Sequence, residues 1–323
     1  MTGVTTEAGA AGPAPLRVGV LGTGALGYHH VRLLAALPEA ELVGVFDASP
    51  AAAERVREDH GARVFERLED LAGAVDAAVV AVPTVFHAEV AGPLLERGIH
   101  VLVEKPMASS LAEADRLIAA AERSGAVLGV GHVEFYNPAV QALLAAGGTP
   151  RFVEIERLAR FTPRSLDVDV VLDLMIHDLQ ILHALDDSPL GEIRATGIDV
   201  LSPRVDIANA RIELASGCVA SVTASRVSAE RVRKLRIFRE HRYHSLDYQA
   251  QEIKGFRLEA AEESGGERRI VADDLPVTAA EPLRRELQAF LARCRGEQVP
   301  FADGASGRRA LATALAIAAK IGR

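Results

Sequence analysis

Three short motifs in this chain carry residue types that could do redox chemistry. In sequence order they are Gly22-Thr23-Gly24-Ala25-Leu26-Gly27, Glu104-Lys105-Pro106 and Asp173-Leu174-Met175-Ile176-His177-Asp178. The first has the glycine spacing of a dinucleotide-binding turn. The second supplies a lysine, and the third an acid and a histidine four residues apart, which are groups that can move a proton. Together they predict a nicotinamide-dependent enzyme with a Lys/His/Asp proton-handling site.

The glycine motif predicts where a cofactor would bind. In such a turn Gly22 bends the chain, Gly24 admits a pyrophosphate and Gly27 lets the helix pack closely, so Thr23, Ala25 and Leu26 are expected at the cofactor too. Asp47 lies twenty residues after Gly27, where an acid bonds the ribose hydroxyls. Because Asp47 would repel a 2′-phosphate and no arginine follows before Arg55, NAD is favoured over NADP. The alternative is a glycine-rich structural turn.

The segment 170–185 is expected to be an apolar, buried helix that carries the chemistry. At helical spacing Asp173, His177 and Gln180 fall on one stripe. An aspartate one turn before a histidine can hold its tautomer and keep it basic, which suits it to take a proton from an alcohol as hydride leaves. The alternative is a buried structural Asp–His pair. Asp178 is expected to cap or pair locally, and His183 to be structural.

Lys105 is expected at the carboxyl end of a parallel strand, 99–103, where ligands bind in open sheets. A lysine there can bond the substrate hydroxyl and stabilise developing alkoxide charge. Glu104 could tune that charge, and Glu104 and Lys105 are also expected at the cofactor. Pro106 would fix the turn, with a cis peptide left open. The alternative is an ordinary surface lysine.

The elements that must position these residues change character along the chain. The first half alternates strand and helix, which is typical of a parallel, doubly wound sheet. The second half has successive strands with few helices, which indicates an antiparallel sheet. Strands are expected at 16–21, 41–46, 63–65, 75–82, 99–103, 126–130, 151–158, 193–201, 208–214, 218–225, 235–239 and 243–248, and helices at 27–37, 50–61, 87–97, 110–124, 170–185, 281–294 and 307–321.

These patterns predict a fold of class α/β plus α+β: an N-terminal Rossmann domain and a C-terminal α+β domain on an open, mainly antiparallel sheet. The site is expected in the cleft between them. The predicted division is a disordered tail at 1–15, the Rossmann domain at 16–132, the substrate and oligomerisation domain at 133–305, and a helix at 306–323 that packs back on the first domain.

Composition excludes several classes of partner. With 323 residues the chain suits two domains, and its net charge of -8 argues against binding nucleic acid or an anionic membrane. Its two cysteines, Cys218 and Cys294, have no metal-type spacing, so we expect structural thiols, no metal site and a cytoplasmic location. Residues 1–15 lack the pattern of a signal peptide, and no apolar run is long enough to span a membrane.

Over residues 16–322 these motifs resemble the Gfo/Idh/MocA family of NAD(P)-dependent oxidoreductases. The resemblance implies that Lys105 and His177 handle the proton and that Asp173 contacts the substrate. It also implies that the nicotinamide packs near Pro83, Thr84 and His87. Members usually act on sugars, cyclitols or sugar nucleotides, commonly as dimers or tetramers formed through the open sheet.

A narrower resemblance concerns residues 161–164, 167–178, 206–211 and 223–228. They are similar to one bacterial branch of the family that oxidises UDP-N-acetylglucosamine at C3 and is often linked with lipid A assembly. That branch carries Glu-Arg-Phe-Asn-Pro where this chain has Glu134-Phe135-Tyr136-Asn137-Pro138, so a basic residue is missing there. The alternatives are a dehydrogenase of a free sugar or inositol, and a non-catalytic NAD-binding regulatory protein.

Candidate substrate contacts lie in three places. Arg164, on the loop before the helix 170–185, is a candidate for a diphosphate, and Tyr136 and Asn137 are expected to line the cleft, with a core position for Tyr136 as the alternative. The stretch 226–242 is rich in basic residues, and its alternative role is an exposed or intersubunit sheet face. Its candidates for the diphosphate are Arg226, Arg231, Arg233 and Lys234.

Overall fold

A five-stranded parallel sheet forms the first half of the fold. The computed structural model describes residues 14–162, 168–259 and 268–322, and its first sheet has the order β2-β1-β3-β4-β5. Its central strands are short apolar runs buried on both faces, as a parallel sheet between helices requires. The strands are β1 (Leu16–Leu21), β2 (Ala40–Phe46), β3 (Ala77–Val80), β4 (His100–Glu104) and β5 (Leu128–Gly131).

The helices α2 and α5 between these strands begin at capping serines and end at glycines. Ser49 and Ser110 accept hydrogen bonds from the first turns of α2 and α5, and Gly61 and Gly125 end those helices in the left-handed conformation. The expected strand at 63–65 is wrong, because the segment makes only a single bridge to β2. The helices are α1 (Ala25–Leu34), α2 (Pro50–His60), α3 (Leu68–Ala72), η1 (Thr84–Phe86), α4 (His87–Glu96) and α5 (Leu111–Ser124).

An eight-stranded, mainly antiparallel sheet forms the second half. Its order is β13-β12-β11-β10-β6-β9-β8-β7, and β6 and β9 are its parallel pair. The predicted fold class is therefore confirmed, although β12 and β13 were not expected. The strands are β6 (Phe152–Leu158), β7 (Leu190–Ile198), β8 (Ile207–Leu214), β9 (Val219–Ser225), β10 (Val232–Arg239), β11 (Arg242–Asp247), β12 (Glu252–Glu259) and β13 (Arg269–Ala272).

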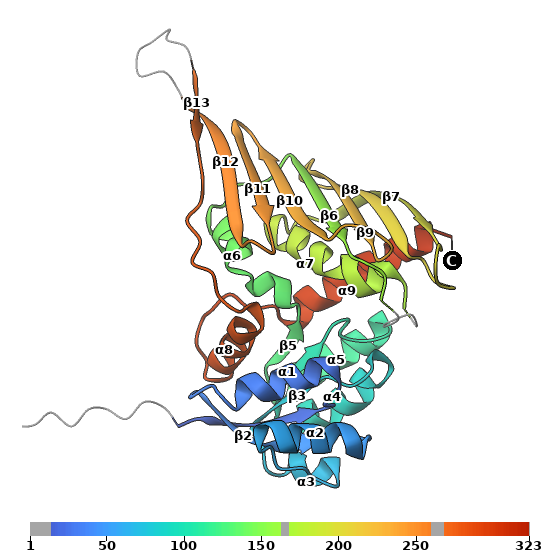
Figure 1. Cartoon of the computed structure of the whole chain (residues 1–323), viewed down its shortest axis with the longest axis vertical. Helices are drawn as coiled ribbons and strands as arrows, with labels where there is room; N and C mark the ends of the chain where they lie inside the picture. The colour runs from blue at the N-terminus through green and yellow to red at the C-terminus, as the bar shows by residue number, and fades with distance from the viewer. Residues whose placement is uncertain (1–13, 163–167, 260–267, 323) are drawn as a thin grey trace, which may run out of the picture.

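Helices cover one face of this sheet (Figure 1). They include α6 (Pro138–Ala145) and α7 (Ile176–Leu185), and α7 is preceded by a π-helical turn, η3 (Val171–Met175). The prediction of a single α-helix at 170–185 is thus wrong for its first turn, which is π-helical. The other face of the sheet carries the exposed apolar side chains Phe238 and Phe256.

The two last helices, α8 (Pro282–Cys294) and α9 (Gly304–Lys320), run between the two sheets (Figure 1). The inner face of α8 joins the core around β1 and β2, while α9 packs against α5 and β5 on one side and α7 and β7 on the other. The division into domains, with its boundary at 305, stays a prediction. Within the described residues, no helix has both the length and the apolar content that crossing a bilayer requires.

Candidate functional site

The carboxyl ends of the parallel strands bring the first two motifs to one edge of the sheet. The glycine motif follows β1, Asp47 follows β2 and Pro83 lies shortly after β3. Lys105 follows β4, the neighbour of β3 in the sheet. This is the edge at which open α/β sheets bind their ligands.

The glycine turn leaves room for a dinucleotide. A Cβ at Gly22, whose φ is +88°, would lie 2.6 Å from the Ala81 carbonyl oxygen, and one at Gly27 would lie 1.8 Å from the Gly22 oxygen. A Cβ at Gly24 would meet nothing within 4 Å. Within the described part of the chain no side chain caps the start of α1, so its first N–H groups stay available, and the residues fit a pyrophosphate there.

Asp47 reaches back to the glycine turn. Its carboxylate accepts hydrogen bonds from the Thr23 hydroxyl at 2.9 Å and from the Ser49 N–H at 2.7 Å. Arg55 also reaches this place, because its guanidinium donates to the Thr23 carbonyl at 3.4 Å. The arginine that is eight positions from Asp47 in the sequence is therefore close to it in the fold.

The glycine turn gives a prediction that separates cofactor binding from folding. We expect Gly24→Ala to raise the Kd for NAD about tenfold or more, about 1.4 kcal/mol, with an unchanged Tm, because its methyl group enters only the pyrophosphate space. Gly27→Ala should lower both affinity and Tm, because its methyl group would overlap the Gly22 carbonyl. Calorimetric titration and thermal unfolding measure the pair. Wild-type affinity in Gly24→Ala would show that the pyrophosphate lies elsewhere.

Lys105 joins the two halves of the fold at the site. Its Nζ donates to the main-chain oxygen of Asp173 at 2.6 Å and to Oδ1 of Asp173 at 3.3 Å. The two side chains are only 14% and 22% exposed, and the Lys105–Pro106 peptide is cis. The structure thus pairs Asp173 with Lys105, whereas the sequence predicted a pairing with His177.

His177 opens α7 and faces a second imidazole. Its ring meets that of His132 edge to face, with 5.9 Å between the ring centroids, and its buried Nδ1 has no hydrogen-bond partner among the described residues. Burial, followed by the nearby charges of Lys105 and Arg157, holds the pKa of His177 well below its ordinary value. The expectation that its surroundings keep it basic is wrong, and the ring is neutral near pH 7.

A buried ion network lies behind His177. Arg157 occupies an inward position of β6 and binds both oxygens of Asp178, at 2.8 and 2.7 Å, and Glu134 at 2.8 Å. Arg233 binds the same Glu134 oxygen at 3.2 Å. Asp178 was expected to cap a helix or to pair locally, and that expectation is wrong. An arginine at the third inward position of an alternating strand was the sequence signal for this network.

Glu104 has a partner that the sequence analysis missed. Its Oε1 lies 2.7 Å from Nε2 of His30, on α1, and its Oε2 accepts the Lys105 N–H at 3.2 Å. Although burial acts to raise the pKa of Glu104, the hydrogen bond with His30 and the charges of His30 and Lys105 hold it below its ordinary value. His30 lies three residues after the glycine motif, a spacing that no rule of dinucleotide binding singles out.

Three expected contact residues have partners within the chain. His87 is buried, with Nδ1 2.9 Å from the Pro106 oxygen and Nε2 2.9 Å from the Val82 oxygen, so it ties α4 to the lysine turn. Asn137 caps α6 and donates to the Tyr248 carbonyl at 3.0 Å. The Tyr136 hydroxyl accepts the Ala302 N–H at 3.1 Å within a small apolar cluster, which is the core alternative. Arg164 lies outside the described residues.

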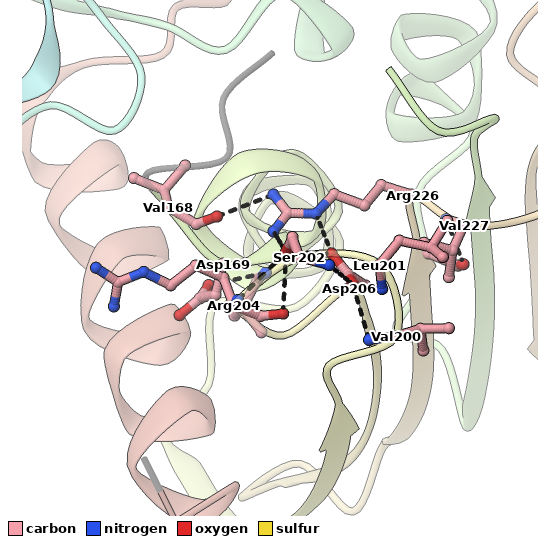
Figure 2. A network of polar contacts seen from close by, with 11 residues as sticks. Val168, Asp169, Val200, Leu201, Ser202, Arg204, Asp206, Arg226 and Val227 are labelled. Atoms are coloured by element: carbon pink, nitrogen blue, oxygen red, sulfur yellow. Dashed lines mark hydrogen bonds and ion pairs between the residues drawn. The ribbon is translucent and has the colours of Figure 1, made fainter. Parts of the chain in front are cut away.

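Arg226 is part of a buried polar network within the chain and does not have the expected role (Figure 2). It is buried, forms an ion pair with Asp206 at 2.8 Å, and donates to the Val168 carbonyl at 2.9 Å and the Ser202 hydroxyl at 3.0 Å. It thus holds the segment before η3 against the loop that ends at Asp206. Both expected roles, diphosphate contact and exposed sheet face, are wrong for Arg226. Arg231 is exposed.

The glycine turn at the carboxyl edge of the first sheet is typical of an oxidoreductase that binds a nicotinamide dinucleotide. Residues 16–132 match the Gfo/Idh/MocA model, described as an oxidoreductase family with an NAD-binding Rossmann fold. A UDP-N-acetylglucosamine 3-dehydrogenase of Acidithiobacillus ferrooxidans is 38% identical over 305 residues, 94% of this chain and 96% of that protein. The chain belongs to the Gfo/Idh/MocA family of oxidoreductases, as its motifs predicted.

Two further comparisons extend this finding. A solved structure of the Acidithiobacillus ferrooxidans enzyme superimposes with a TM-score of 0.88 at 36% identity, and the match covers 95% of this chain and 97% of that one. A scyllo-inositol 2-dehydrogenase (NAD(+)) of Bacillus subtilis is 29% identical over 234 residues, 66% of this chain and 68% of that protein. The family therefore includes relatives that act on nucleotide sugars and on free cyclitols.

Proposed function

We propose that this oxidoreductase uses NAD to oxidise a secondary alcohol of a nucleotide sugar, with UDP-N-acetylglucosamine at C3 as the first candidate. The observation that carries the proposal is the contact of Lys105 Nζ with Asp173, because it brings a cation and a carboxylate from the two halves together at the ligand-binding edge of the sheet. The similarity to a UDP-N-acetylglucosamine 3-dehydrogenase along nearly the whole chain supports the choice of substrate.

Each of the three residues would have its own role. NAD, when bound, supplies the hydride acceptor. Lys105 Nζ would donate to the substrate hydroxyl and stabilise the negative charge that develops on its oxygen. His177 would accept the hydroxyl proton at Nε2, since Nδ1 is buried. Asp173 would position both Lys105 and the substrate.

The choice of NAD over NADP rests on Asp47. Its carboxylate lies at the end of β2 next to Thr23, where a 2′-phosphate would meet its negative charge. Arg55 lies beside the same turn, and its positive charge would attract a 2′-phosphate. We propose that Asp47 dominates, because it is the closer group to Thr23 and its hydrogen bonds fix it there.

Other candidate contacts are proposed for the rest of the substrate. Arg233 faces the helix-covered side of the second sheet and is the proposed diphosphate contact among the described residues. Arg231, exposed just before β10, is the second candidate, whereas Lys234 lies on the opposite, helix-free face with Phe238. The exposed Phe238 and Phe256 on the helix-free face support a homo-oligomer formed through that face.

The decisive experiment follows NADH absorbance with purified protein and a panel of substrates. The panel contains UDP-N-acetylglucosamine, UDP-glucose, N-acetylglucosamine and myo-inositol, each with NAD and with NADP, and with an aminotransferase and glutamate as its amino donor to remove the keto product. We expect turnover with UDP-N-acetylglucosamine and NAD. Equal efficiency with a free sugar or inositol would refute the nucleotide-sugar assignment and favour the second candidate, which the inositol dehydrogenase relative supports.

A further inference from the structure

Helix α8 places an unpartnered carboxyl group in the interior, behind the lysine turn. Glu286 is fully buried, and neither of its carboxylate oxygens has a hydrogen-bond partner within the described part of the chain. A buried polar group without a partner is costly, so its protonation state and neighbours need a physical account. Polar groups of α1 and of the end of β4 lie close to it.

Glu286 forms a buried trio with His30 and Glu104. One donor atom from each side chain lies within 4.8 Å of the other two. Within the trio, His30 Nε2 and Glu104 Oε1 are 2.7 Å apart, and Glu104 Oε2 accepts the N–H of Lys105. Because an ionised carboxylate can only accept, His30 must carry its hydrogen on Nε2.

Two buried carboxylates this close together cannot both be ionised without strong repulsion. Glu104 has the partners that stabilise an anion, namely the imidazole of His30 and the N–H and charge of Lys105. Glu286 has none. Burial and, after it, the charge of Glu104 raise the pKa of Glu286 well above its ordinary value. Glu286 is thus the member of the pair that takes the proton.

We propose that Glu286 is a positioning residue: a buried carboxylic acid that stays protonated at neutral pH and directs its hydrogen toward Glu104 through one bridging water, which the spacing of up to 4.8 Å between their atoms allows. A neutral Glu286 leaves Glu104 free to remain an anion that holds the N–H of Lys105. The proposal deepens the proposed function, on which it rests for the role of Lys105. It assigns α8, from the last part of the chain, a part in placing that lysine.

The ionisable groups around Glu286 come from three elements. They are His30 on α1, Glu104 with Lys105 at the end of β4, and Tyr136 in η2 (Val133–Tyr136), whose pKa burial raises and the charge of Glu286 would raise further. A histidine and two carboxylates are also donors that a divalent cation accepts. However, both oxygens of Glu104 are already engaged, so we favour the proton.

The first test detects the proton on Glu286 directly by infrared spectroscopy of the full-length protein without substrate. We expect an infrared carbonyl band of a protonated carboxylic acid at pH 7 that shifts in D₂O and is missing in Glu286→Gln. Absence of this band from the wild-type protein would overturn the proposal. Glu297→Gln, on the exposed turn after α8, is the matched control and should keep the band.

The second test uses the pH dependence of stability. A folded acid with a raised pKa binds its proton more tightly than the unfolded chain does, so wild-type stability falls as pH rises above the unfolded value of about 4.3. Glutamine does not titrate. The Tm of Glu286→Gln minus that of the wild type should therefore grow from pH 5 to pH 8. A constant or falling difference contradicts a protonated Glu286. If EDTA lowers the wild-type Tm and zinc restores it, the trio holds a metal cation and Glu286 is not protonated.

The third test asks whether Glu286 acts on the lysine. Glu286→Leu should lower kcat about tenfold or more with little change in KM for NAD, because a small displacement of Lys105 is costly, and Glu286→Gln should recover most of the loss. Equal losses in both variants would remove the positioning role. The first two tests need no turnover, so they stand or fall separately from the proposed reaction.

Discussion

Replacing Lys105 with alanine is expected to lower kcat by about 10²-fold or more, because the transition state loses the cation that stabilises charge on the substrate oxygen. Lys105 is the residue whose Nζ contacts Asp173 from the other half of the fold. Its loss should leave the Kd for NAD nearly unchanged, since the glycine turn and Asp47 remain. Steady-state kinetics on the substrate identified by the NADH assay, with calorimetric titration of NAD, measure both quantities.

A matched control is available on the surface. Lys254 is exposed on β12, at the far side of the second sheet, so Lys254→Ala should have wild-type kinetics. Lys105→Arg keeps the charge but not the compact ammonium and should recover only part of the activity. Near-normal turnover in Lys105→Ala would remove Lys105 from the mechanism and, with it, the observation that carries the proposed function.

His177→Ala is expected to lower kcat by about 10²- to 10⁴-fold, the usual contribution of a positioned general base. In the wild type the base must be neutral to accept a proton. Since burial and the charges of Lys105 and Arg157 hold the pKa of His177 well below its ordinary value, oxidation should persist into acid. The acid limb of kcat/KM should therefore lie below pH 6.5, the ordinary histidine pKa, and it should be missing in His177→Ala.

The control for this experiment is His241, which lies in the exposed turn between β10 and β11. His241→Ala should leave both the rate and the acid limb unchanged. An acid limb at or above pH 6.5 in the wild type would mean that the neighbours of His177 do not act on it as described. An unchanged rate in His177→Ala would move the base to another group, and His132 would be the first to examine.

Local signals carried most of the first half of the fold. The strands β1 to β5 are short apolar runs with glycine, proline or serine at their ends, and these signals depend on near neighbours in the sequence. The same holds for the cofactor turn and Lys105, because a strand end followed by a loop can be recognised from the sequence alone. Of the second sheet, β12 was missed since its glutamates, lysine and glycine obscure the alternation of a half-buried strand.

The sequence could not show which side chains from distant segments pair in the fold. Lys105 and Asp173 are 68 residues apart, and Arg157 and Asp178 meet only because β6 lies beside α7. One local pattern, Asp-x-x-x-His, suggested the wrong partner for Asp173, since a π-helical turn replaces the α-helical turn that the spacing assumed. Pairings of this kind depend on tertiary packing, which the hydrophobic period does not encode.

The return of α8 to the first sheet has a consequence for how the protein is made. Leu287, Phe290 and Leu291 complete the apolar core around β1 and β2, although they are synthesised more than 240 residues later than those strands. When only the cofactor-binding segment of the nascent chain has emerged from the ribosome, part of its apolar core is therefore still exposed. Completion of the dinucleotide-binding half must wait for the end of translation, and a fragment that stops at residue 132 would carry an exposed apolar surface prone to aggregation.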